Sequence, residues 1–356
     1  MKLAIIGDLH LFTLRIHPRR LLSRRVMAQS NLWLNRRHRF NHALLPELAD
    51  RVRHVAPEML LLSGDVTTSS LESEFEDFMA FARPLVGQGT DEAGIPGVLV
   101  PGNHDRYTFK SRRVKRIEDL LESVMPARFP DLRDLSPGWQ LLALDSAIPN
   151  KVFSRGALGS DQLAEAEQAI RSVPAGQGLV VLCHYPCTLP PRVPSAWSHD
   201  LKEDARLRAA LQACPGRVVY VHGHIHKPWH VLPEVVDDAD APVPVTRARS
   251  GLTGRGRRGG KLKPAFECIN AGSPCMTSEK YPLGQGFWEI ELPEDPLAPL
   301  RSVHHVPLPA DMETDADGDA NTDQGHAGGT DRATAPAPPT SRATAGGVRW
   351  ITGPTV

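Results

Sequence analysis

The stretch KLAIIGDLH (residues 2–10) decides the fold class. Its first part, Leu3–Ile6, is a short run of apolar residues, which is typical of a β-strand buried on both faces. Gly7, Asp8, Leu9 and His10 follow immediately. A strand that ends on a glycine and then on a carboxylate and an imidazole is typical of the sheet edge where α/β proteins bind ligands.

The same pattern recurs along the chain. Five further runs are short and almost entirely apolar, and we predict a strand for each: Met59–Leu62, Gly97–Val100, Leu141–Leu144, Leu179–Leu182 and Val218–Val221. Strands of this kind, separated by helical segments, predict a layered α/β fold.

Two of the intervening segments have a recognisable helix start. Ser69 is expected to cap a helix that begins near Leu71, and Ser160 is expected to cap another. The apolar stripes that should face the core are Phe75, Phe78 and Met79 in the first helix and Leu163, Ala166 and Ile170 in the second.

Polar, chemically active side chains follow five of the six predicted strands. In chain order they are Asp8 and His10, then Asp65, then Asn103, His104 and Asp105, then His184, and finally His224 and His226. Oxygen and imidazole ligands without a thiolate fit Mn, Fe or Zn better than Mg alone. Asp8 and His10 can face one ion, His224 and His226 can serve two adjacent ions, and Asp65 is well placed to bridge the pair.

The series GDLH (7–10), GD (64–65), GNHD (102–105), His184 and GHIH (223–226) resembles the calcineurin-like metallophosphoesterase family in order and spacing, over roughly residues 1–275. The resemblance implies two packed mixed β-sheets flanked by helices, a four-layer sandwich with two divalent metal ions at one rim. It implies that Asp8, His10, Asp65 and His226 bind one ion, and that Asp65, Asn103, His184 and His224 bind the other. It further implies that His104 is a non-ligand histidine that assists the leaving group, and we expect Asp105 to orient it.

The resemblance implies a phosphohydrolase. Two ions about 3.5–4 Å apart can clamp the attacking and leaving oxygens of an in-line displacement. We therefore expect a hydroxide that bridges the ions to cleave a phosphate ester or anhydride. A non-catalytic scaffold with the same fold is the alternative, although every ligand position is filled. Monoester, diester, cyclic nucleotide and pyrophosphate substrates all remain open.

Composition limits the partners and the compartment. Lys and Arg total 41, as do Asp and Glu, so no global charge favours nucleic acid, and no obligate protein partner is evident. The five cysteines form no CxxC pair, which favours free thiols in a reducing cytoplasm. No apolar run reaches the roughly 18–20 residues of a membrane span. We expect a folded domain over 1–308 and a disordered tail over 309–356, which is rich in Asp, Gly, Thr, Ala and Pro.

A first basic insertion, at about residues 11–45, carries eight arginines and no Asp or Glu. It is either an interfacial helix that meets anionic lipid at the inner membrane face, or a cap helix with solvated arginines. We name Arg24, Arg25, Arg36 and Arg37 as candidate substrate contacts. The insertion is similar in character to additions in UDP-diacylglucosamine hydrolases of lipid A synthesis. The stretch Leu144–Ser146 instead resembles the cyclic-nucleotide phosphodiesterase branch.

A second basic insertion, at about residues 229–267, mixes Arg and Lys with glycines. Such a segment can follow a phosphate backbone, so a nuclease is a further alternative. No aromatic residue lies among its charges between 247 and 265, which argues against base stacking. A flexible surface loop is the preferred interpretation.

Overall fold

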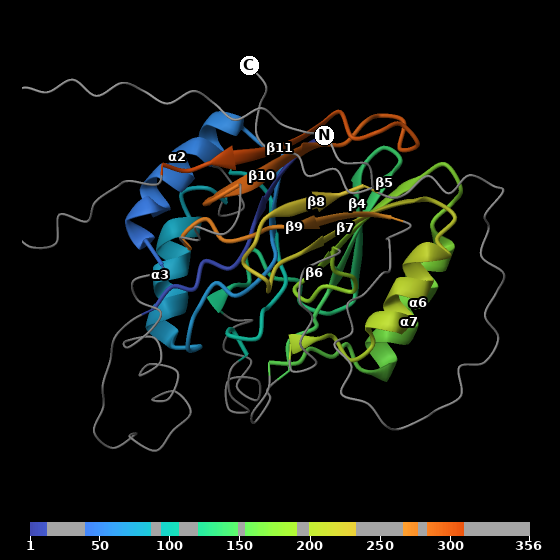
Figure 1. Cartoon of the computed structure of the whole chain (residues 1–356), viewed down its shortest axis with the longest axis horizontal. Coiled ribbons are helices and arrows are strands. Elements are labelled where there is room, and N and C mark those ends of the chain that lie inside the picture. The colour runs from blue at the N-terminus through green and yellow to red at the C-terminus, as the bar shows by residue number, and fades with distance from the viewer. Residues whose placement is uncertain are drawn as a thin grey trace, which may run out of the picture.

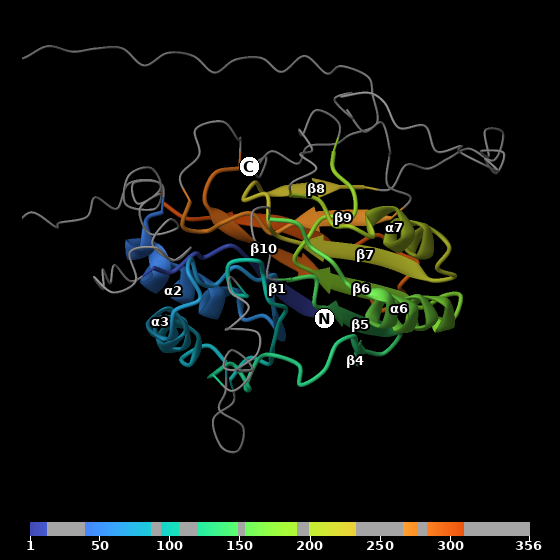
Figure 2. The same cartoon turned by 90° about the horizontal axis from the view of Figure 1, so that it is seen from below.

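Two β-sheets pack face to face, and helices cover the outer face of each (Figures 1 and 2). This arrangement comes from a computed structural model, which describes residues 1–12, 40–86, 94–106, 120–148, 154–190, 199–232, 266–276 and 283–309. The predicted α/β class and the two mixed sheets are confirmed.

The first sheet contains strands from both ends of the chain. Its order is β11-β10-β1-β2-β3. The strands are β1 (Lys2–Ile6), β2 (Met59–Leu62), β3 (Gly97–Leu99), β10 (Gly286–Glu291) and β11 (Ser302–Pro307). β1, β2 and β3 are parallel, whereas β10 is antiparallel to β1, with Lys2 opposite Glu291. The first strand of the chain, β1, is therefore paired on one side with β10, the second-last strand.

The second sheet has the order β4-β5-β6-β7-β9-β8, which can be followed from bottom to top in Figure 2. Its strands are β4 (Asp131–Ser136), β5 (Trp139–Leu144), β6 (Gly178–Cys183), β7 (Arg217–His222), β8 (Trp229–Val231) and β9 (Glu267–Asn270). β5, β6, β7 and β9 are parallel, and the two edge strands β4 and β8 are antiparallel to their neighbours. Four strand ends of this sheet therefore point to the same rim.

The helices complete four layers. The 3-10 helix η4 (His42–Leu44), α2 (Leu45–Val55) and α3 (Glu72–Ala82) belong to the first-sheet side, and α6 (Ser160–Ser172) and α7 (Asp204–Gln212) cover the second sheet (Figure 1). Three apolar cores lie between the layers. One lies between the first sheet and helices α2 and α3, one lies between the two sheets, and one lies between the second sheet and helices α6 and α7. Burial of three such interfaces is the main stabilising contribution to the fold.

The two predicted helices are present, but their caps differ from the prediction. α3 begins at Glu72, and Glu74 reaches back so that its Oε2 accepts from the N–H groups of Leu71 (3.0 Å) and Ser69 (2.9 Å). A glutamate at the third helical position thus replaces the expected Ser69 cap. α6 begins at Ser160 itself, after Gly159 at φ 79°. Both predicted apolar stripes are buried.

Several predictions fall outside the described residues. These are the arginines of 13–39, among them Arg24, Arg25, Arg36 and Arg37, the basic segment 233–265, and the tail from 310 onward. The second insertion is shorter than expected, because Trp229–Val231 and Glu267–Asn270 pair as β8 and β9.

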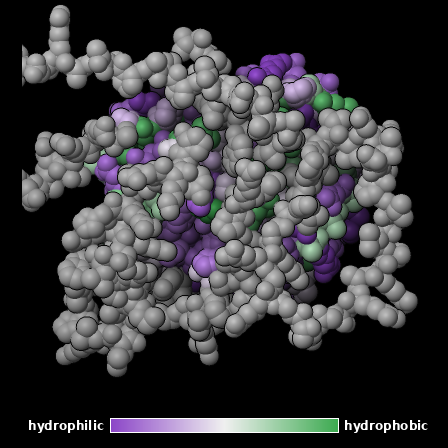
Figure 3. Space-filling view, viewed as in Figure 1, coloured by the Kyte–Doolittle hydropathy of each residue, from purple (hydrophilic) through white to green (hydrophobic). Residues whose placement is uncertain are grey.

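No described helix is both long and apolar enough to cross a membrane. All five cysteines are free thiols, as predicted. Where described residues are in view in Figure 3, hydrophilic and hydrophobic ones are interspersed, and the exposed large hydrophobic side chains among the described residues are Leu132, Leu232 and Leu297.

Candidate metal centre

The carboxyl ends of parallel strands from both sheets meet at one rim. The loops after β1, β2 and β3 supply Asp8, His10, Asp65 and Asn103 from the first sheet, and those after β6 and β7 supply His184, His224 and His226 from the second. The structure therefore brings together all seven ligand residues predicted from the sequence.

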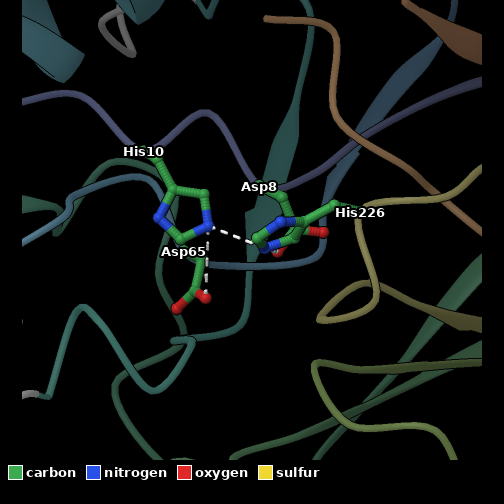
Figure 4. Close-up of side chains that lie close together, drawn as sticks. All are labelled: Asp8, His10, Asp65 and His226. Carbon is green, nitrogen blue, oxygen red and sulfur yellow. Dashed lines mark hydrogen bonds and ion pairs between the residues drawn. The ribbon is translucent and has the colours of Figure 1, made fainter. Parts of the chain in front are cut away.

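Four of them form what we call the first donor set: Asp8, His10, Asp65 and His226. Each offers one ligand atom, and these atoms all lie within 4.8 Å of one another. His10 Nε2 is 2.9 Å from His226 Nε2 and 3.6 Å from Asp65 Oδ2. His226 Nε2 is 3.6 Å from Asp8 Oδ1. Figure 4 shows the His10 ring directed toward both His226 and Asp65.

The second donor set consists of Asp65, Asn103, His184 and His224. Ligand atoms of Asp65, His184 and His224 lie within 4.8 Å of one another. Asn103 Oδ1 is 3.2 Å from His184 Nε2 and 3.0 Å from His224 Nδ1. His184 Nε2 is 3.4 Å from Asp65 Oδ2. The oxygen Asp65 Oδ2 thus belongs to both donor sets.

The chemistry of the donors fits divalent cations. Two ligand atoms that each lie about 2.1 Å from one ion are separated by roughly 3–3.5 Å, which matches the spacings found here. His184 Nδ1 lies 2.7 Å from the Ser63 carbonyl oxygen, so Nδ1 carries a hydrogen. In the neutral ring, Nε2 then presents a lone pair to two oxygens, Asp65 Oδ2 and Asn103 Oδ1, an arrangement that a cation stabilises.

The backbone of the ligand loops is strained. Asp8, His10, Asp65, His224 and His226 have φ between 50° and 72°. Among the described non-glycine residues, only Ala56 and Ser70 share this left-handed conformation. Each such residue costs about 1–2 kcal/mol relative to the right-handed region. Strain concentrated on five ligands indicates that this rim is shaped for function rather than for stability.

Two glycines allow the loops to come this close. A Cβ at Gly102 would lie 2.1 Å from Asp65 Oδ1, and one at Gly223 would lie 2.8 Å from Asp8 Oδ2. Both distances are far inside van der Waals contact, so any side chain there would displace a ligand carboxylate.

Burial and mutual charge shift the pKa values of the metal-free ligands. Burial raises the pKa of Asp8 well above its usual value. Burial alone would also raise the pKa of Asp65, but the neighbouring imidazoles, His184 foremost, hold it well below the usual range. Burial opposes the charged form of His184, yet Asp65 and Asp8 raise its pKa to about 9. In His224, burial and the His184 charge both lower the pKa. A proton on His184 thus takes the place that a cation fills.

We expect metal binding to release protons. Because the pKa of His184 is about 9 in the metal-free protein, this imidazole is protonated at pH 7 and must lose its proton to bind an ion. The affinity of the second donor set should therefore fall about tenfold per pH unit as the pH drops below 9. Calorimetric Mn²⁺ titrations in two buffers of different ionisation enthalpy measure the released protons. Binding that is independent of pH between 6 and 8 would contradict this assignment.

His104 lies beside the donor sets, and it is half-buried whereas most of the candidate ligands are buried. Its ring packs edge-on against that of His10, with centroids 4.8 Å apart. Its Nδ1 is 2.7 Å from the Thr68 carbonyl oxygen. A carbonyl oxygen only accepts, so Nδ1 carries a hydrogen.

Asp105 does not orient the His104 ring, contrary to expectation. Its Oδ1 accepts from Thr67 N–H (2.9 Å) and Thr67 Oγ1 (3.0 Å), and its Oδ2 accepts from Gly102 N–H (2.9 Å). Burial raises the pKa of Asp105 to about 6. Asp105 therefore ties the loop after β3 to the loop after β2.

Sequence reasoning missed the residues that hold the ligands. The carbonyl of Ser63 orients His184, the Thr68 hydroxyl donates to the His10 carbonyl (2.7 Å), and the Ser273 hydroxyl donates to the Asp8 carbonyl (2.7 Å). The Tyr185 ring packs 4.2 Å from that of His224. Ser63, Thr68 and Tyr185 are close to motif residues in sequence, which is the only signal that could have found them.

Similar solved structures include a dimetal phosphatase from Danio rerio, with 12% identity, a TM-score of 0.47, and coverage of 81% of this chain and 91% of that one. A purple acid phosphatase from yellow lupin has 13% identity, a TM-score of 0.47, and coverage of 81% and 48% respectively. Among curated proteins, none matches the chain. The family model for calcineurin-like phosphoesterases matches residues 1–228, so the chain belongs to this family of metal-dependent phosphoesterases.

Proposed function

We propose that the protein hydrolyses a phosphate ester or anhydride bond of an anionic, lipid-linked nucleotide of the UDP-diacylglucosamine type. The observation that carries the hydrolytic part is Asp65 Oδ2, which lies 3.6 Å from His10 Nε2 and 3.4 Å from His184 Nε2 and so joins two donor sets. A shared carboxylate oxygen between two clusters of ligands supports a dinuclear centre.

Two bound ions would supply an acidified water and neutralise charge on the phosphoryl oxygens. The side chains of the protein have distinct tasks around them. Asp65 holds the two donor sets at a fixed separation, and the Ser63 carbonyl keeps His184 in the tautomer that exposes Nε2. His104 is fixed through Nδ1 by Thr68, and its other nitrogen, Nε2, would donate a proton to the departing oxygen.

For the metals we propose Mn, Fe or Zn. Each donor set contains two imidazoles and at least one carboxylate, and no cysteine belongs to either. Imidazole favours these transition metals over Mg, and the absence of thiolate from the sets argues against a structural zinc site.

The lipid-linked substrate is supported by where the first basic segment begins and ends. The chain leaves the described residues at Phe12 and re-enters at Phe40. The Phe40 ring lies 5.1 Å from that of His10 and 6.3 Å from that of His226. Residues 13–39, with eight arginines and no acidic residue, are thus attached beside the first donor set. We propose that Arg24, Arg25, Arg36 and Arg37 contact substrate or anionic lipid, at the cytoplasmic face of a membrane.

The second basic segment is attached differently. Val231 pairs with Cys268, and β9 runs parallel to β7 toward the donor sets. The β8–β9 hairpin therefore opens into residues 233–265 on the side that points away from the ligands. This attachment favours the first segment over the second as the one that meets substrate.

The experiment is Mn²⁺-dependent release of UMP from UDP-diacylglucosamine in detergent micelles, with bis-p-nitrophenyl phosphate as a soluble control. We expect the fourfold variant Arg24→Gln, Arg25→Gln, Arg36→Gln, Arg37→Gln to raise KM for the micellar substrate and leave the soluble one unchanged. The matched variant Arg255→Gln, Arg257→Gln, Arg258→Gln should change neither. Turnover of the soluble diester without UMP release would move the substrate to soluble diesters, and inactivity toward both would favour the scaffold.

A further inference from the structure

The loop Gly102–Arg106 supplies three parts of the centre at once. Asn103 Oδ1 faces His184 and His224 in the second donor set. The His104 N–H donates to Asp65 Oδ1 (2.8 Å), which turns the other oxygen of that carboxylate toward both sets. The His104 ring lies against His10. A shift of this loop would therefore disturb a ligand, the shared carboxylate and the non-ligand histidine together.

The loop is held on its first-sheet side by Asp105. Besides the bonds from Thr67 and Gly102 to its carboxylate, the Asp105 carbonyl accepts from the Ser70 hydroxyl (2.7 Å). These contacts all lie within loops of the first sheet. They cannot by themselves set the distance from Asn103 to the two histidines on the second sheet.

That distance is spanned by Arg106 and Asp145. Arg106 is the last residue of the loop, and its Nη2 lies 2.8 Å from Oδ2 of Asp145, which directly follows β5 of the second sheet. The side chains are 6% and 19% exposed, so water screens the pair weakly.

Asp145 is itself held in place by hydrogen bonds to Gln162 and Ala147. Gln162 of α6 accepts from its N–H and donates to its carbonyl oxygen, both at 2.8 Å. The Asp145 Oδ1 accepts from the Ala147 N–H (2.9 Å). The carboxylate that binds Arg106 is therefore fixed to the second sheet, on the strand next to the one that leads to His184.

We propose that Arg106 and Asp145 are a positioning pair that sets Asn103 against His184 and His224, and so controls occupancy of the second donor set. The inference rests on the proposed dinuclear centre. It predicts an asymmetry, because Asp8, His10 and His226 of the first donor set are not on this loop. Loosening the pair weakens the second ion more than the first, because the second donor set contains Asn103 of this loop, whereas the first depends on the loop only through the shared Asp65.

A purely structural role predicts a different result. If the pair only stabilised the fold, its loss would lower the thermal midpoint and affect both ions equally or neither. The discriminating measurement is therefore the two separate Mn²⁺ affinities of the purified full chain, read from the signal of free Mn²⁺ in electron paramagnetic resonance.

The main variant is Asp145→Asn, which keeps the Oδ1 acceptor for Ala147 and removes the charge that binds Arg106. We expect the second Mn²⁺ to bind about 10–100-fold more weakly, the range typical of lost support around a metal ligand. The affinity for the first Mn²⁺ should fall by less than about tenfold, which is below the range typical of lost support around a metal ligand. Activity should recover toward the wild-type kcat when Mn²⁺ is raised, because the second ion then binds again.

Arg106→Lys repeats the test while keeping the buried positive charge, and it replaces Asp145→Asn should that variant fail to fold. The matched control is Arg217→Lys, since Arg217 pairs with Glu267 at 2.6 Å at the start of β7, away from the ligands. Wild-type affinity for two Mn²⁺ ions in both Asp145→Asn and Arg106→Lys would overturn the proposal. Equal weakening of the two ions in these variants would also overturn it. A wild-type chain that binds neither Mn²⁺ nor Zn²⁺ would refute the dinuclear centre itself, which is a separate outcome.

Discussion

Asp65→Ala is expected to remove both metal ions and to reduce turnover by more than about 10⁴-fold, the upper end of what loss of one general acid–base group costs. The reason is the double use of one oxygen: Asp65 Oδ2 is 3.6 Å from His10 Nε2 and 3.4 Å from His184 Nε2. Without this oxygen, both donor sets lose the anionic ligand that they share. Metal content by mass spectrometry and turnover of bis-p-nitrophenyl phosphate measure the two losses.

Asp65→Asn sharpens this test. The amide keeps an acceptor for the His104 N–H, so the loop after β3 should stay in place, but the shared anionic oxygen is gone. Glu267→Gln is the control, because Glu267 is also a buried carboxylate, paired with Arg217 and His230 instead of with ligands. Retention of two ions in Asp65→Asn would show that Asp65 is not the bridging ligand.

His104→Ala is expected to lower kcat by about 10²–10⁴-fold while two ions remain bound. The His104 ring packs against that of His10 and its Nδ1 is engaged by Thr68, while the backbone N–H that holds Asp65 remains in the alanine variant, so we expect no metal ligand to be lost. The deficit should shrink for leaving groups of low pKa, which depart without a proton. A series of aryl and alkyl phosphate esters measures this dependence.

His54→Ala, on the exposed face of α2, is the matched control for removal of a histidine. Loss of metal from His104→Ala would contradict the assignment, since it would make His104 a ligand or an essential support. A deficit that is equal for good and poor leaving groups would show that His104 positions substrate without transferring a proton.

The strands that the sequence predicts are those buried on both faces. Runs such as Val180–Leu182 are continuous in apolar residues because helices or the other sheet cover each side. The missed strands are antiparallel or short. β4, with the sequence DLRDLS, is half-exposed at an edge, and β8 and β9 are only three and four residues long. Their pairing depends on partners distant in sequence, which no local pattern contains.

The residues that make up the candidate donor sets could be predicted, whereas their supports could not. Asp, His and Asn after successive strands are visible as side chains in the sequence, and their family resemblance assigned them to two ions. Ser63 holds His184, and Thr68 holds His104, through backbone carbonyl groups, which every residue possesses. The Arg106–Asp145 pair depends on how two sheets pack, and the bottom-up pattern could not distinguish two sheets from one.

The pairing of β1 with β10 has a consequence for biosynthesis. Asp8 follows a strand whose neighbours are β2 on one side and β10, near residue 290, on the other. During translation the N-terminal strand therefore lacks one partner until almost the whole domain has left the ribosome, and closing so long a loop makes that step late and slow. A stop codon after residue 309 would spare the described fold, whereas one before Gly286 would leave the nascent chain with an open edge beside its first ligands.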